Sequence, residues 1–202
     1  HETTRALVDL YSDSDDPSTG HVILTYDIEC EMTSGLPNPE EAKRREDEAR
    51  QRRTEFYINS KEEFIIQLAK EINEFILQAN GKEVLFRLNG TSDIRWEKLK
   101  IREGKNIFEL YPDVQFYDYT KNPKRFDGSM PSNYHLTFSR SEDNDKSAMS
   151  VLAKGYNVAM VFDKVLPKKY EGYKVINGDE TDLRFKDKKG VIVGLKYKNN
   201  TG

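Results

Sequence analysis

Two acidic residues at alternate positions of one predicted strand give the clearest chemical signal in this sequence. Residues 21–30 read HVILTYDIEC, where β-branched and aromatic residues dominate and acids come late, a pattern that predicts a strand. Alternate side chains of a strand share a face, so we expect Asp27 and Glu29 to lie together. Carboxylates are preferred ligands of divalent cations such as Mg²⁺ and Mn²⁺. The sequence therefore leaves open a carboxylate site for such an ion, with Asp27 and Glu29 as a pair on one face of the strand.

A site of this kind needs three or four acidic ligands, so two carboxylates require partners from elsewhere in the chain. Later segments supply candidates, because polar clusters follow most of the predicted strands. Those strands are predicted at residues 83–88, 114–119, 134–139, 157–162, 173–176 and 191–195. The substrate-binding candidates in or after them are Asn89, Asp93, Asp118, Lys121, Arg140, Glu142, Asp163, Asp179 and Asp182. If the strands are parallel, their carboxyl ends form one rim and these side chains converge there.

Structural roles remain open as alternatives, both for these polar residues and for three aromatic residues near them. Loops between strands and helices are polar in any case, and Asp or Ser often serves there as a helix cap, as Ser141 would before Glu142. Trp96, Tyr117 and Tyr119 have rings that stack well on a nucleic-acid base. Packing in the core is the alternative role for these three rings.

The elements that would position the rim follow from hydrophobic periodicity. Residues 60–80 predict a helix with an apolar stripe that includes Leu68 and Ile72, and Ser60 with Glu63 predicts a capping box at its start. Shorter helices are expected at residues 104–110 and 142–154. Helices that alternate with strands predict an α/β fold with a mainly parallel sheet and crossover helices, either open or a partial β/α barrel.

The N-terminal region has a different composition. Residues 40–53 read EEAKRREDEARQRR, with opposite charges four positions apart, as in Glu40 with Arg44 and Glu46 with Arg50. Such pairs support a solvated helix, and the same composition also suits a linker. We therefore expect residues 1–55 to form a strand plus a charged helix or linker, and residues 56–202 to form the α/β domain.

Composition excludes several classes of function. The chain has 202 residues and a formal net charge of −3, so no overall basic field attracts nucleic acid. One cysteine, Cys30, and three histidines are too few for an iron–sulfur or histidine-built zinc site, and a lone cysteine suits a reducing compartment. The apolar runs are too short for a membrane span and no signal-peptide pattern precedes them, which predicts a cytoplasmic protein with no membrane contact.

Several separate blocks resemble a known phage family. From about residue 86 to residue 196, the strings RLNGTSDIRWE, YPDVQFYDYTKNPKR, NYHLTFSRSEDN and NVAMVFDKVLP are similar to those of the phage gene product 88 family. The resemblance covers a little over half of the chain and implies phage origin and a shared fold. Family members often carry an N-terminal cysteine cluster, which this chain lacks.

A second resemblance covers residues 1–43. The strings LVDLYSDSDDPSTGH, TYDIEC and GLPNPEEAK resemble the first exonuclease motif of phage family B DNA polymerases. This resemblance implies that Asp27 and Glu29 bind the two metal ions that remove a 3′-terminal nucleotide. The sequence thus predicts a metal-dependent 3′-5′ exonuclease-like site acting on single-stranded DNA in the cytoplasm of an infected cell. The alternative is a gene product 88-type module that binds a ligand or partner at the rim without catalysis.

Overall fold

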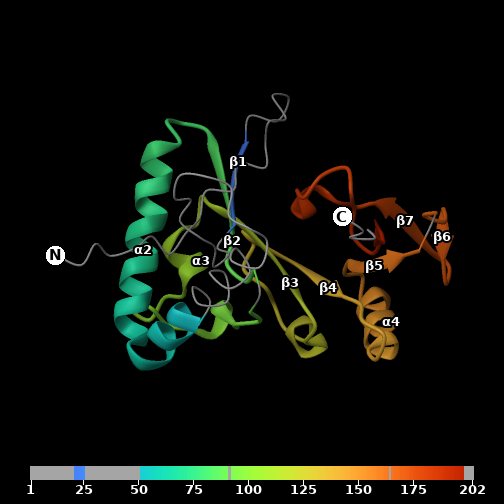
Figure 1. The fold of residues 1–202 in the computed structure, drawn as a ribbon, viewed down its shortest axis with the longest axis horizontal. Coiled ribbons are helices and arrows are strands. Elements are labelled where there is room, and N and C mark those ends of the chain that lie inside the picture. The colour runs from blue at the N-terminus through green and yellow to red at the C-terminus, as the bar shows by residue number, and fades with distance from the viewer. Residues whose placement is uncertain (1–20, 26–50, 91, 164, 198–202) are drawn as a thin grey trace, which may run out of the picture. The chain divides into compact units, whose positions relative to one another are not determined.

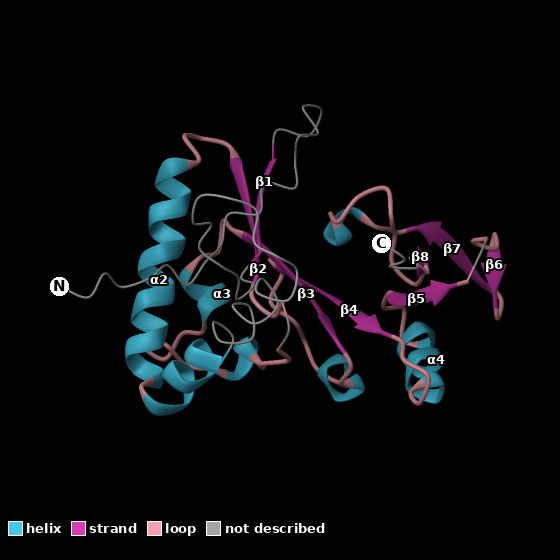
Figure 2. Ribbon diagram, viewed as in Figure 1, coloured by secondary structure: helices cyan, strands magenta, loops and turns pink. Residues whose placement is uncertain are grey.

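The structure, a computed structural model, describes residues 21–25, 51–90, 92–163 and 165–197. The chain splits into two compact units, residues 1–116 and 117–202. Asp27, Glu29 and residues 40–50 lie outside the described residues, and the predicted boundary at residue 55 stays a prediction. Helices and strands alternate along most of the described chain (Figure 2).

The first unit is built on parallel strands joined through helices (Figure 1). Strand β1 (His21–Thr25) pairs in parallel with β2 (Glu83–Arg87), with His21 opposite Glu83, and β2 pairs in parallel with β3 (Gln115–Thr120). Helix α2 (Lys61–Gln78) lies between β1 and β2 in sequence. The short helices η1 (Trp96–Lys98) and α3 (Ile107–Leu110) lie between β2 and β3.

The apolar stripe of α2 is buried, as its periodicity predicts. Phe64, Leu68 and Ile72 are at most 3% exposed, and the three central residues of β2 are also buried, which is usual where helices cover a parallel sheet. The predicted capping box is wrong, because the Ser60 side chain makes no capping hydrogen bond. Residues 51–59 are already helical and the Ser60 amide donates to Phe56 O. Ser60 therefore lies at a break between two consecutive helices and does not begin a helix that follows a loop.

Besides the end of β3, the described residues of the second unit form four parallel strands and one short antiparallel strand. They are β4 (Tyr134–Ser139), β5 (Val158–Phe162), β6 (Lys169–Tyr170), β7 (Tyr173–Asn177) and β8 (Ile192–Lys196). Their order is β4-β5-β8-β7-β6, with β6 antiparallel to β7. The helical segments of this unit are η2 (Pro123–Phe126), α4 (Asp145–Ala153) and η3 (Arg184–Lys186).

The predicted α/β class with mainly parallel strands is confirmed. The pairs β1–β2, β2–β3, β4–β5, β5–β8 and β7–β8 are all parallel. The strand order does not close on itself, so the open alternative describes the fold and a barrel is not supported. Strand β6 was not predicted, since two residues carry no periodicity. Within the described part of the chain, no helix combines the length and apolar character that a bilayer crossing needs.

Candidate functional site

Part of the predicted rim, namely the residues that follow β4, β5 and β7, lies within the second unit. Strands β4, β5, β7 and β8 run in the same direction, so their carboxyl ends lie at one edge of the sheet. Arg140 follows β4, Asp163 follows β5 and Asp179 follows β7. This strand direction is the one the prediction required. The binding role of the three side chains stays a prediction.

Several of the rim side chains make contacts within the second unit. Arg140 forms an ion pair with Asp145, and this hydrogen bond raises the pKa of Arg140 and lowers that of Asp145. Asp179 Oδ2 accepts a hydrogen bond from the backbone amide of Lys196 at 2.9 Å. Asn144, rather than Ser141, organises the turn before α4: its Oδ1 accepts from the Ser141 amide at 2.8 Å. The expected helix cap at Ser141 is wrong, because the N-cap residue of α4 is Asn144, whose side chain makes no capping hydrogen bond. Glu142, Asp163 and Asp182 are exposed.

Asp118 lies inside β3 and is fully buried. Its Oδ2 accepts a hydrogen bond from the Tyr134 hydroxyl at 2.9 Å, and that hydroxyl accepts one from Arg125 Nη2 at 2.9 Å. Burial, together with the Asp118 charge, holds the pKa of Tyr134 well above its ordinary value. A charged side chain at this depth needs such partners, so this network ties β3 to η2 and to the first residue of β4. Lys121, one residue after β3, is exposed.

Asn89 follows β2 and is 2% exposed, and its amide organises the loop that follows. Its Oδ1 accepts hydrogen bonds from Ser92 Oγ, the Ile94 amide and Trp96 Nε1 at 2.9 to 3.1 Å. Asp93 in the same loop is exposed. Trp96 is fully buried and Tyr117 is 2% exposed. Both rings pack in the interior, which favours the core interpretation over base stacking.

The metal site cannot be placed from the described residues, because Asp27 and Glu29 lie outside them. Strand β1 ends at Thr25, two positions before Asp27, and its parallel partner β2 ends at Arg87, two positions before Asn89. Among the residues that the structure describes, no three His, Cys, Asp or Glu side chains are grouped as a metal ion would require.

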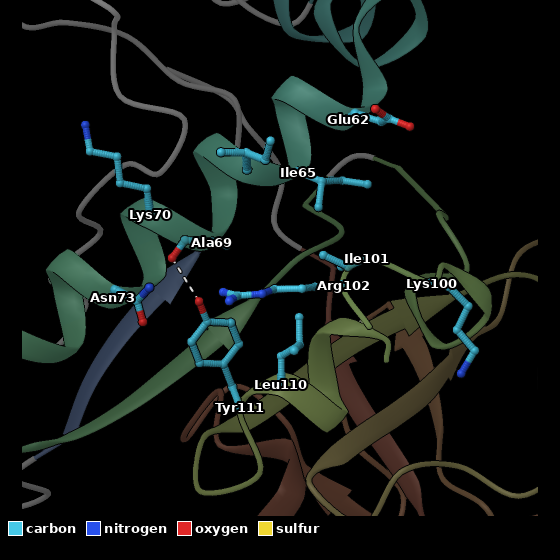
Figure 3. Close-up of a pocket in the computed structure, with 11 residues that line it drawn as sticks. Glu62, Ile65, Ala69, Lys70, Asn73, Lys100, Ile101, Arg102, Leu110 and Tyr111 are labelled. Atoms are coloured by element: carbon cyan, nitrogen blue, oxygen red, sulfur yellow. Dashed lines mark hydrogen bonds between the residues drawn. The ribbon is translucent and has the colours of Figure 1, made fainter. Parts of the chain in front are cut away.

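A concave site lies in the first unit, between α2 and the segment before β3 (Figure 3). Its volume is about 920 Å³, which is within the range of small-molecule sites. One wall is a stripe of α2, next to the stripe that enters the core, and the other runs from Lys100 to Tyr111. The lining residues are Glu62, Ile65, Ile66, Ala69, Lys70, Asn73, Lys100, Ile101, Arg102, Leu110 and Tyr111. We call this site the α2 groove.

A tight turn places Arg102 in the α2 groove. Arg102 and Lys105 form an isolated antiparallel bridge, and the Lys105 amide donates to Arg102 O at 2.8 Å. The two residues between them, Glu103 and Gly104, have φ of 52° and 72°, which is the backbone of a type I′ turn. Gly104 takes this conformation without strain, whereas Glu103 is a non-glycine residue in the left-handed region. The turn fixes the backbone position from which the Arg102 side chain extends.

Tyr111 joins the two walls. Its hydroxyl donates a hydrogen bond to Ala69 O in α2 at 2.9 Å. Partial burial raises the pKa of Tyr111, while contacts with Asn73 and Arg102 oppose that rise. Figure 3 shows the Arg102 side chain reaching across the groove towards Tyr111 and Asn73. A guanidinium, a phenol and an amide therefore meet at one end of a groove whose other lining is largely apolar.

The α2 groove was not predicted from the sequence. Its α2 wall is a second stripe next to the core stripe, and Arg102 lies about thirty positions further along the chain. The only local signal was Glu103-Gly104, which indicates a turn but not what the turn faces.

The second unit contains another buried ionic group besides the one at Asp118. The Arg184 side chain is fully buried, and its Nε lies 3.4 Å from Asp187 Oδ2. His135 on β4 lies close enough to Arg184 for the guanidinium charge to affect its protonation. Burial, together with the charges of Arg184 and Lys189, lowers the pKa of His135 from 6.5 to about 4. The imidazole is therefore neutral at neutral pH, and protonating it would add a cation next to a buried guanidinium.

The fold is that of an α/β protein with an open, mainly parallel sheet and a small-molecule-sized groove. A family model described as gene product 88 matches residues 39–201. The chain therefore belongs to the gene product 88 family. Comparison with curated proteins and with solved structures gave no match. The family confirms the first resemblance; no comparison confirms the exonuclease resemblance.

Proposed function

We propose that this gene product 88 protein is a non-catalytic binding module and that it takes a small ligand in the α2 groove. The observation that supports this is the composition of the groove: apolar side chains from α2, Ile101 and Leu110 lie beside charged ones, and Arg102, Tyr111 and Asn73 meet at one end. Small-molecule sites commonly combine these features. A binding module with its ligand at the rim was the alternative to the exonuclease that the sequence left open. Here the ligand site of the module is the α2 groove instead of the rim.

A fluorescent probe with an apolar body tests the proposal. N-phenyl-1-naphthylamine is uncharged and brightens in apolar surroundings. Ile66 lines the groove and is 69% exposed, whereas Leu77 on the same helix is 79% exposed and does not line it. Ile66→Asn and Leu77→Asn thus make the same change on the same helix, inside and outside the groove.

We expect the wild-type protein to bind the probe, and Ile66→Asn to weaken binding by about fivefold, because one apolar contact of roughly 1 kcal/mol is lost. Leu77→Asn should leave binding unchanged. Equal affinities for all three proteins, or no binding at all, would contradict the proposal.

The second candidate function is the divalent-metal 3′-5′ exonuclease-like phosphodiesterase, with Asp27 and Glu29 as ligands of Mg²⁺ or Mn²⁺. The parallel pairing of β1 with β2 favours it, because the carboxyl ends of these two strands, Thr25 and Arg87, lie at the same edge of the sheet. Asn89 and Asp93 follow that edge. Single-stranded DNA would be the substrate, and the cytoplasm of an infected cell, where the lone Cys30 stays reduced, would be the location.

This second function is tested by degradation of a 3′-labelled single-stranded DNA in Mn²⁺. The wild-type protein should shorten the DNA, and Asp27→Ala should abolish the activity. Asp15→Ala serves as the control, because it removes an acid from the same region outside the motif. Equal activity of wild type and Asp27→Ala would assign the cleavage to other residues or to a contaminant.

A further inference from the structure

The charges around the α2 groove select among possible ligands. Its lining includes three cations, Lys70, Lys100 and Arg102, and one carboxylate, Glu62. The net charge of the lining at neutral pH is therefore +2, although the whole chain carries −3. Three further carboxylates, Glu74, Glu103 and Glu109, lie within 4 Å of these cations. An anion is therefore favoured at an individual cation that can exchange its partner, and not by the charge of the groove as a whole.

The existing ion pairs of these cations are weak enough to be exchanged. Lys70 lies 3.9 Å from Glu74, Lys100 lies 3.4 Å from Glu109, and Arg102 lies 3.6 Å from Glu103. Each pair is largely exposed, and exposed pairs of this kind contribute little to stability. A ligand anion can therefore replace Glu103 at Arg102 at little cost to the fold.

Arg102 is the cation best placed to receive the anion. Its side chain extends across the groove towards Tyr111 and Asn73, whereas the amino group of Lys100 points away (Figure 3). Guanidinium and amide N–H groups donate hydrogen bonds, and a guanidinium matches the two oxygens of a carboxylate or phosphate. The apolar residues Ile65, Ile101 and Leu110 leave room beside this end for a body without charge.

We infer that the α2 groove binds a small anionic amphiphile, with its charged head at Arg102 and its apolar body against α2 and Leu110. The inference rests on the proposed binding function and adds the class of the ligand. It makes Arg102 a determinant of specificity: the guanidinium distinguishes a charged ligand from an uncharged one of the same shape.

Two dyes with nearly the same body separate these contributions. 8-Anilinonaphthalene-1-sulfonate carries one negative charge, and N-phenyl-1-naphthylamine carries none. Arg102→Gln removes the guanidinium and keeps an exposed polar side chain. Lys82→Gln makes the same change in net charge at an exposed lysine outside the groove.

We expect Arg102→Gln to weaken binding of the sulfonate dye by about tenfold, as the loss of a charge-assisted hydrogen bond implies. The same substitution should leave the uncharged dye unaffected. Lys82→Gln should change neither affinity. Raising the salt concentration should weaken the sulfonate dye in the wild type and have little effect in Arg102→Gln.

The outcomes distinguish the inference about the charge of the ligand from the proposed binding function of the α2 groove. If both dyes bind and depend on Ile66 while Arg102→Gln affects neither, the groove is a binding site and the inference about charge is overturned. Equal weakening of both dyes by Arg102→Gln would also overturn it, because the effect would then be one of shape. If neither dye responds to Ile66→Asn, the proposed function itself fails.

Discussion

Acidification should destabilise the protein through His135, and the structure gives the size of the effect. Burial and the neighbouring cations lower the pKa of this imidazole from 6.5 to about 4. The unfolded chain therefore binds a proton on His135 at pH values where the folded protein does not. Stability is fully present above about pH 6.5 and is lost as the pH falls towards 4.

The magnitude follows from the two pKa values. Each pKa unit corresponds to 1.36 kcal/mol, and integration from neutral pH down to about pH 5 gives roughly 2 kcal/mol. The ring is partly exposed rather than fully buried, so solvent screens some of this, and we expect about 1–2 kcal/mol. That is a large part of the stability of a typical domain.

Denaturant unfolding at about pH 7.5 and about pH 5 measures the effect, with His135→Gln as the reference protein. Glutamine cannot be protonated in this range, while the carboxylates common to both proteins contribute equally to each. The free energy of unfolding of the wild type should fall by about 1–2 kcal/mol more than that of His135→Gln. If the two proteins lose the same stability on acidification, His135 is not neutral and desolvated as described.

Three further predictions concern the core, the buried network and the metal. Ile72→Ala should cost about 2–5 kcal/mol in denaturant unfolding because Ile72 is fully buried, whereas Ile66→Ala on the exposed side of α2 should cost under about 0.5 kcal/mol; similar losses would show that α2 does not pack as described. Tyr134→Phe should cost roughly 1.5–3 kcal/mol in the same assay because Asp118 loses a buried hydrogen bond, and a neutral result would remove the structural role of that network. If Asp27 and Glu29 bind Mn²⁺, a hundredfold excess over the dissociation constant should add roughly 2.7 kcal/mol of stability, lost in Asp27→Asn; a melting temperature unchanged by millimolar Mn²⁺ would argue against the exonuclease.

Local pattern predicted the elements well where a local cause forms them. The α2 stripe and the largely apolar runs of β4, β5 and β8 can be recognised from side-chain patterns that the sequence displays directly. The Ser60 capping box failed because the preceding residues are also helical, so no helix start was available to cap. Strand β6 was missed because two residues pair with β7 through backbone groups that any sequence supplies.

The sequence by itself determined the α/β class, the parallel strands and hence the shared edge that Arg140, Asp163 and Asp179 follow. It also determined the family, because several separate blocks match. Only the tertiary structure decided what the polar residues contact: Asn89 and Asp118 are buried in internal networks, while Arg102 faces a groove. The physical reason is distance along the chain. Periodicity shows which side of an element is apolar, but a groove forms where two elements far apart in sequence leave space between them.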